Sequence, residues 1–289
     1  MGHVNSEVEV LGIEVPATLL AQWATWFAPE SQPFAVPFGS PLAHAGRVFE
    51  PVNEPEVRDT LELYSQPSGM VLRSFTHDEF ASLPRATRSG LVRAQVTHGR
   101  GQVPSVRAWP SLRDEGIADQ ADGHRFVWWP ALLNGRESDV LVPFVEDGRR
   151  ASRHGDVLAA VWSGAAEVLP LAQELAGTFP RGSGPNCFGT VMGAAGVSDA
   201  AGTWMQREPF EEWLSDVTKP GGRDDEPGTV LVWRSTGGVV QHAAVTLGDG
   251  WALHKPSQGW MSPVKVLAVR DVIHSARAAD RRLVRRSLA

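Results

Sequence analysis

Cysteine is nearly absent from this chain of 289 residues, which contains only Cys187. A single cysteine cannot form an internal disulfide, and it excludes the Cys-rich frameworks that hold structural zinc. No hydrophobic run approaches the roughly 20 residues that a membrane-spanning helix needs. The N-terminal segment is acidic where a signal peptide requires a basic start. The sequence therefore predicts a soluble, cytoplasmic protein with no membrane partner.

Lysine is also scarce, and the formal net charge is -6. A negative chain is poorly suited to collecting the phosphates of a nucleic acid. Residues 276–286, ARAADRRLVRR, concentrate five arginines near the C-terminus. We interpret them as a solvated terminal helix whose basic residues complement the helix dipole. The sequence thus predicts no nucleic-acid partner, and it does not indicate an oligomeric state.

The composition, 42% hydrophobic and 21% charged, is that of a folded globular protein, so intrinsic disorder is excluded. A change of texture near residue 150 divides the chain into a mixed α/β N-terminal region, 1–150, and a second domain, 151–289. The N-terminal region carries no chemical motif. It is a candidate for shaping the site of the second domain.

Two helices and a hairpin are expected in the N-terminal region. Residues 17–28 are apolar enough for a buried helix, and 76–95 have helical spacing interrupted at Pro84. Residues 126–146 read as two antiparallel strands around the turn Asn134-Gly135. Pro130 and Pro143 would then place these strands at sheet edges.

The second domain begins with helical patterns and ends with strand patterns. Apolar spacing predicts a helix over 154–177, a Gly-rich helix from Cys187 to about 196 and a helix over 210–217. Strand-like runs follow at 229–234, 239–247, 250–256 and 264–273. This order predicts an α+β domain in which the helix that begins at Cys187 lies on a small antiparallel sheet.

Cys187 is the first candidate for chemistry. Asn186 is a preferred helix cap, and Gly184 and Pro185 mark a turn before it. A thiol in the first helical turn meets free backbone N–H groups, which stabilise a thiolate and can hold an oxyanion. The alternative is that a lone cysteine is a small buried hydrophobic residue.

Two histidines lie symmetrically about Gly248 in the segment HAAVTLGDGWALH. If the loop contains an odd number of residues and is centred on Gly248, His242 and His254 are direct cross-strand partners. Only the small Ala244 and Ala252 share their face. Glycines in the helix at Cys187 would likewise allow that helix to approach the sheet closely.

In this geometry His242 takes the proton of Cys187, and His254 orients the ring of His242. Alternatively, the histidines are core or surface residues whose rings hydrogen-bond to backbone groups. A third possibility is that Cys187, His242 and His254 together bind zinc. Trp251 is expected on the face away from His254, which leaves Trp260 as the candidate for lining a substrate groove. The segment GPNCFGT lacks the lysine of a phosphate loop, and it follows a poor strand for a hydrolase elbow.

The segments NCFGTVM, PGTVLVWR and HAAVTLGDGWALH together resemble the NlpC-type cell-wall cysteine peptidases of the papain-like superfamily. The likeness covers about residues 155–265, and the spacing of the histidines about the Gly-Asp-Gly turn is its most specific part. The resemblance implies a papain-like catalytic domain in which Cys187 is the nucleophile, His242 the base and His254 the orienting residue.

The chain departs from this family where Asn186 and Phe188 flank the cysteine and where Thr229 replaces an aspartate. We expect a cytoplasmic cysteine amidase or peptidase that forms an acyl-enzyme on a small peptide-like or acyl substrate, with no cofactor and no metal. An amide-forming acyltransferase with the same Cys-His-His site is the first alternative. A non-catalytic binding module that retains the fold is the second.

Overall fold

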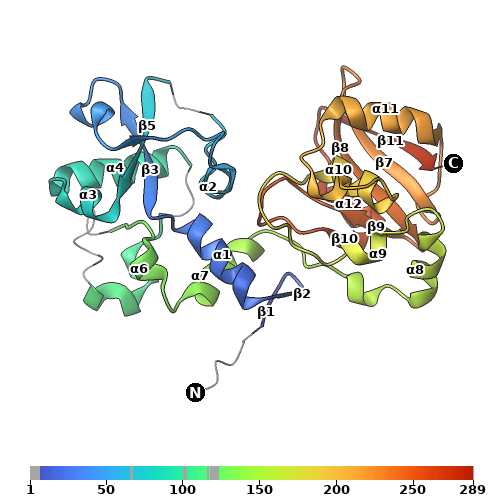
Figure 1. Ribbon diagram of the computed structural model, residues 1–289, viewed down its shortest axis with the longest axis horizontal. Coiled ribbons are helices and arrows are strands. Elements are labelled where there is room, and N and C mark those ends of the chain that lie inside the picture. Colours follow the sequence, from blue (N-terminus) through green and yellow to red (C-terminus); the bar gives the residue numbers. More distant parts are fainter. Residues whose placement is uncertain (1–6, 66–67, 100–102, 116, 118–123, 289) are drawn as a thin grey trace. The chain divides into compact units, whose positions relative to one another are not determined.

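The computed structural model describes residues 7–65, 68–99, 103–115, 117 and 124–288. The chain forms two compact units (Figure 1). The first contains Pro16–Phe144, and the second combines Glu7–Val15 with residues 145–288. Both contain helices and antiparallel strands, so the fold class is mixed α+β. No helix among the described residues is both long enough and apolar enough to cross a membrane.

The N-terminal hairpin belongs to the second unit, although the sequence assigned it to the first region. Its strands, β1 (Val8–Val10) and β2 (Ile13–Val15), pair with each other. At the turn, the backbone N–H of Leu11 donates to Glu146 at 2.9 Å, and the Leu11 carbonyl accepts from the N–H of Ser152 at 2.7 Å. These bonds attach the hairpin to the start of the second unit.

The first unit has a three-stranded antiparallel sheet of order β3-β5-β4. Its strands are β3 (Ser31–Pro37), β4 (Arg47–Val48) and β5 (Met70–Thr76). Its α-helices include α1 (Ala17–Phe27), α2 (Pro55–Thr60), α3 (His77–Ser82) and α4 (Arg85–Thr97), and its 3-10 helices are Pro41–His44, Val106–Ala108 and Pro110–Glu115. The predicted helix over 17–28 and the helical segment broken at Pro84 are confirmed.

The predicted hairpin over 126–146 is wrong, because this segment forms α6 (Pro130–Leu133) and α7 (Glu137–Glu146). Pro130 is the first residue of α6, where a missing N–H costs nothing. Gly135 has φ +76° and turns the chain between the two helices. An Asn-Gly pair suits either kind of turn, so the dipeptide alone could not distinguish them.

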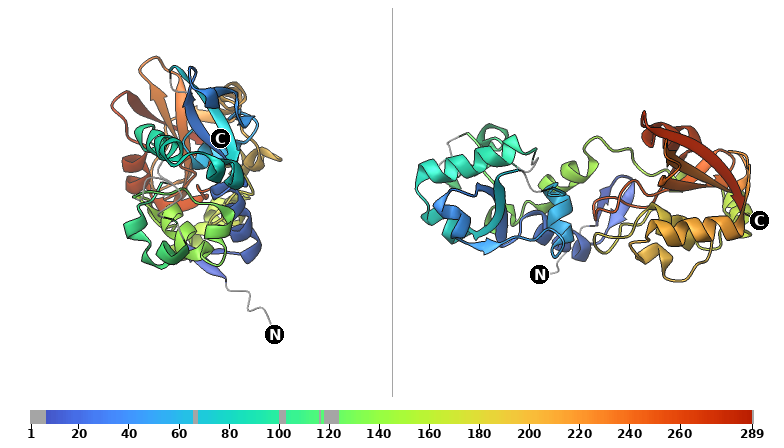
Figure 2. Two further views of the ribbon diagram at one scale, coloured as in Figure 1. Left: turned by 90° about the vertical axis from the view of Figure 1, so that its left-hand side faces the viewer. Right: turned by 90° about the horizontal axis from the view of Figure 1, so that it is seen from above.

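The second unit is built on a six-stranded antiparallel sheet of order β10-β9-β8-β7-β11-β6. Figure 2 shows its strands in orange to dark red. The strands are β6 (Thr218–Pro220), β7 (Pro227–Ser235), β8 (Val240–Gly248), β9 (Trp251–His254), β10 (Lys265–Ala268) and β11 (Arg281–Leu288). The helices are α8 (Ala159–Ala166), α9 (Ala172–Leu175), α10 (Cys187–Ala194), α11 (Arg207–Val217) and α12 (Val269–Ser275), with 3-10 turns at His154–Asp156 and Ala200–Gly202.

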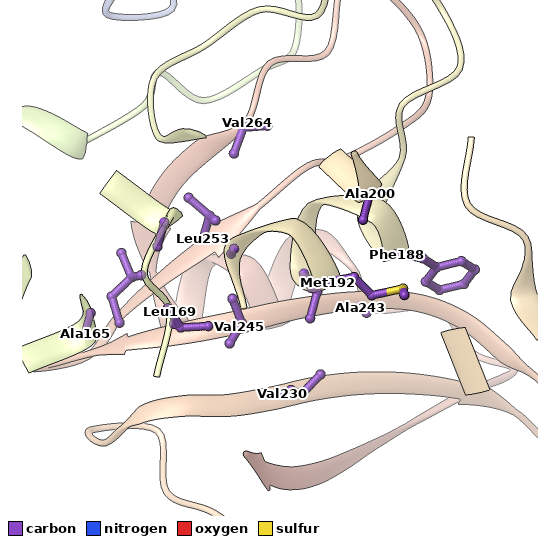
Figure 3. Packing of buried hydrophobic residues seen from close by; sticks show 14 of the residues in the cluster. Ala165, Leu169, Phe188, Met192, Ala200, Val230, Ala243, Val245, Leu253 and Val264 are labelled. Carbon is purple, nitrogen blue, oxygen red and sulfur yellow. The ribbon is translucent and has the colours of Figure 1, made fainter. Parts of the chain in front are cut away.

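The two faces of this sheet have separate apolar cores. On what we call the α10 face, Phe188 and Met192 of α10 pack with Ala243, Val245 and Leu253 of the sheet (Figure 3). Helices α8, α9 and α11 contribute to the same core. On the opposite side, the α12 face, residues of α12 pack against the sheet. The apolar members of that core are Leu231, Trp233, Ala244, Ala252, Leu267, Val269, Val272 and Ala276.

Three predicted elements of the second unit need correction. The helix over 154–177 is divided into α8 and α9, because Pro170 lies between them and cannot continue a helix. The strand over 264–273 ends at Ala268 and continues as α12. The arginine-rich C-terminal segment forms β11 instead of a helix, since its backbone pairs with both β7 and β6. Arg285 also bonds Asp224 at 2.7 Å.

The glycines of α10 accommodate a neighbouring 3-10 turn and not the sheet, contrary to the sequence-based expectation. A methyl group at Gly193 would lie 2.6 Å from the Cβ of Ala201, and one at Gly189 would meet the carbonyl oxygen of Ala200. The sheet side of α10 instead carries the larger Val191 and Met192. The small residues therefore bring Ala200–Gly202 against the helix.

Replacing Gly193 by alanine tests this close packing. We expect Gly193→Ala to lower the free energy of unfolding by about 1–2 kcal/mol, because overpacking outweighs the gain in helix propensity. Gly164→Ala in α8 is the matched control, since nothing lies within 4 Å of the added methyl group. The control should raise stability by about 0.5–1 kcal/mol. Urea midpoints of the two variants check the prediction, and equal shifts would contradict it.

Candidate functional site

Cys187 begins α10, as the sequence predicts, and Asn186 is the N-cap. The side-chain oxygen of Asn186 accepts from the N–H of Gly189 at 3.0 Å, and its amide donates to the carbonyl of Met205 at 2.8 Å. This second bond ties the helix start to the segment before α11. The cap therefore fixes the thiol in the first turn of the helix.

The thiol of Cys187 is partly buried and packs against the core of the α10 face. Burial raises the pKa of Cys187 to about 11, although backbone N–H groups of Ala243, Phe188 and Cys187 itself, together with the charge of Lys255, oppose the rise. The loss of water around the thiol raises its pKa more than the N–H groups at the helix start lower it. Near neutral pH the sulfur is therefore protonated.

The two histidines meet, but not in the predicted register. Thr246 pairs with Ala252, two residues away from the symmetric pairing of Ala244 with Ala252, because the strands change register at the turn. A shift of two keeps every side chain on its predicted face. The Nε2 atom of His242 lies 3.2 Å from Nδ1 of His254, and the two rings are nearly perpendicular at 81°.

Both imidazoles lie on the α12 face. His242 pairs across the strands with Trp233, whose ring centre is 5.2 Å away, and shares its side of β8 with Ala244. The neighbouring residue, Ala243, points to the α10 face and its backbone N–H contacts the sulfur of Cys187. The thiol thus lies against the opposite side of the strand that carries His242.

The structure therefore brings the two imidazoles together and leaves the thiol apart from them. Cys187, His242 and His254 all lie in the described part of the chain, and no hydrogen bond joins the sulfur to either ring. A Cys-His-His row requires that bond. Zinc binding would need the same convergence, and no described group of three or more His, Cys, Asp or Glu side chains is arranged to hold a metal ion.

Both histidines are kept neutral by their surroundings. Burial, followed by the charge of Arg281, lowers the pKa of His242 to about 4. Burial also lowers the pKa of His254 well below its ordinary value, and His242, Lys265 and Lys255 add to this effect. A neutral pair can share one proton between Nε2 and Nδ1 while the remaining ring N–H is free to donate elsewhere.

Trp260 does not line a groove, because its side chain is 0% exposed. Its backbone N–H donates to the hydroxyl of Ser183 at 3.2 Å, so the residue instead anchors the segment after β9. Trp251 packs into the core of the α10 face, as expected for the face away from His254. The tryptophan predicted to contact substrate is therefore part of the interior.

A cavity of about 530 Å³ opens beside the two histidines. No local sequence pattern reveals it, because residues far apart in the chain line it. Among its basic lining residues, Arg281 acts electrostatically on His242 and Lys265 acts on His254. Lys265 is only 3% exposed, and its Nζ donates to the carbonyl of Arg150 at 2.8 Å. A lysine in a strand gives no signal of such a location.

Comparison of the chain with protein-family models, with curated proteins and with solved structures finds no match. The resemblance of residues 155–265 to the NlpC-type peptidases thus stays a prediction.

Because the pKa of His242 is lowered in the folded protein, the folded state loses stability at acidic pH. Between its ordinary pKa near 6.5 and the folded value of about 4, the unfolded chain binds the proton and the folded chain does not, so stability falls as pH falls. From pH 6.5 to 4.5 we expect His242 to contribute a loss of about 2 kcal/mol. His242→Gln should remove this contribution. Urea unfolding at both pH values measures it, with the exposed His44→Gln as control, and equal acid losses in all three proteins would contradict it.

Proposed function

We propose that the second unit is a non-catalytic binding module whose ligand occupies the cavity beside His242 and His254. The observation that carries the proposal is the separation of the thiol from the imidazoles by strand β8. A nucleophilic cysteine needs a base within hydrogen-bonding reach of its sulfur. Here the sulfur contacts backbone N–H groups, and the charge of Lys255 acts on it.

The protonation states support the same proposal. The pKa of Cys187 is raised to about 11, whereas reactive cysteines have a lowered pKa. The pKa of His242 is lowered to about 4, which makes that ring a weak base near neutral pH. Both shifts have burial as their largest cause. They favour a buried structural thiol and a neutral pair of rings that present hydrogen-bond donors or acceptors.

A cysteine amidase or peptidase, or an acyltransferase that uses the same residues, is the second candidate. The position of Cys187 in the first turn of a capped helix favours it, because backbone N–H groups at a helix start can hold an oxyanion. This function requires a rearrangement at the start of α10 or along β8 that brings the sulfur to His242. A papain-like fold, a cytoplasmic setting and a peptide-like or acyl substrate belong to this candidate.

Alkylation of Cys187 by iodoacetamide near pH 7 separates the two candidates. A pKa of about 11 leaves about 100-fold less thiolate than an unperturbed thiol, so labelling should be at least about tenfold slower than for free cysteine. His242→Ala should change the labelling rate by less than about twofold, because the ring does not touch the sulfur. Intact-mass measurement gives both rates, and His44→Ala controls for general effects of losing a histidine.

A different labelling result would support the cysteine enzyme instead of the binding module. Rapid labelling that is strongly slowed by His242→Ala, but not by His44→Ala, would support the cysteine enzyme. A mass increase equal to an acyl group on Cys187 after incubation with amides or esters would support it further. Either finding would overturn the non-catalytic assignment.

A further inference from the structure

The cavity beside the two histidines has an unusual charge. The described residues that line it include four cations and three histidines, and none of its lining residues is an aspartate or glutamate. The cations are Arg149, Arg150, Lys265 and Arg281, and the histidines are His242, His254 and His274. In a chain of net charge -6, such a concentration of positive charge is not a consequence of composition.

One carboxylate near the cavity compensates part of this charge. Arg150 pairs with Asp271 of α12 at 3.0 Å. Lys265 is held by a backbone carbonyl instead of a carboxylate, and burial together with Arg149 and Arg150 lowers its pKa to about 8. Arg281 acts on His242 in the same direction. The positive groups thus repel one another in a space from which water is partly removed.

The cations approach the cavity from different elements. Arg149 and Arg150 come from the start of the second unit, Lys265 from β10 and Arg281 from the first residue of β11. Neutral His242 and His254 line the space between them. Donors arranged around a space in this way match a group that accepts hydrogen bonds in several directions and carries more than one negative charge.

We infer that this cavity binds a small molecule carrying a phosphate group, with Lys265 and Arg281 as its principal charged contacts. The inference rests on the proposed binding function and names the chemical class of its ligand. A phosphate offers oxygens to several donors at once, whereas a carboxylate offers two in one plane. A volume of about 530 Å³ lies within the range of small-molecule sites and exceeds the needs of a bare ion. The polar lining fits a polar ligand body, as in a phosphomonoester.

Calorimetric titration of the full chain with inorganic phosphate and with glycerol phosphate tests the inference. Sodium acetate serves as the carboxylate control, and chloride holds the ionic strength constant. We expect saturable binding of both phosphates, tighter for the ester, and none of acetate at the same millimolar concentration. Arg281→Gln should weaken phosphate binding by about tenfold, because a charge-assisted hydrogen bond is lost.

Arg282→Gln is the matched control. It removes the same charge from the next residue of β11, which does not line the cavity, and should change the affinity less than about twofold. Equal losses in the two variants would show nonspecific attraction and overturn the inference. Absence of saturable binding for both phosphates would also overturn it, as would acetate binding as tight as phosphate. Lys265→Met provides a second variant, with circular dichroism to verify folding, and unchanged affinity in that folded variant would exclude Lys265 as a contact.

The reactivity of Cys187, measured on the same preparation, keeps the two proposals distinguishable. If phosphate binds and Cys187 labels rapidly with dependence on His242, the anion site stands and the non-catalytic assignment fails. If phosphate does not bind and Cys187 labels slowly, the phosphate ligand fails and the binding module remains.

Discussion

The alternation of side chains along strand β8 decides what the second unit can do chemically. His242 and Ala244 point to one face of the sheet, and Ala243 and Val245 point to the other. Because α10 packs on the Ala243 side, the thiol and the imidazoles occupy opposite faces. The local surroundings of each group then follow: the sulfur lies in an apolar core, and the rings lie beside a basic cavity. A register shift of one residue along β8 would exchange the faces to which these side chains point.

The sequence predicts most elements of the second unit and the start of α10, because apolar periodicity and capping chemistry are local properties. The cap at Asn186, the strands β7, β8 and β9 and the face shared by the two histidines are confirmed. Predictions failed where one pattern serves two structures. The pair Asn134-Gly135 forms a turn between two helices instead of a hairpin turn. The arginine-rich segment forms β11, a strand that pairs with β7 on one side and β6 on the other.

The candidate site was harder to predict than the fold. The contact between the two imidazoles could be predicted because both residues belong to one hairpin, and only their register differed. The position of Cys187 relative to them depends on which face of the sheet α10 covers, and no spacing within the sequence encodes that choice. The basic cavity depends on Lys265 and Arg281, which become neighbours of the histidines only through the strand order.

The order of strands in the six-stranded sheet also constrains how the chain folds during synthesis. Strands β6 and β7 follow each other closely in sequence, yet β11 lies between them and leaves the ribosome much later. The same unit also holds the hairpin Glu7–Val15, which is made before the first unit. The first unit, Pro16–Phe144, lies within one stretch of chain and can complete its contacts earlier. Until β11 is made, the facing edges of β6 and β7 have no strand to pair with, and a nascent chain exposes them to its neighbours.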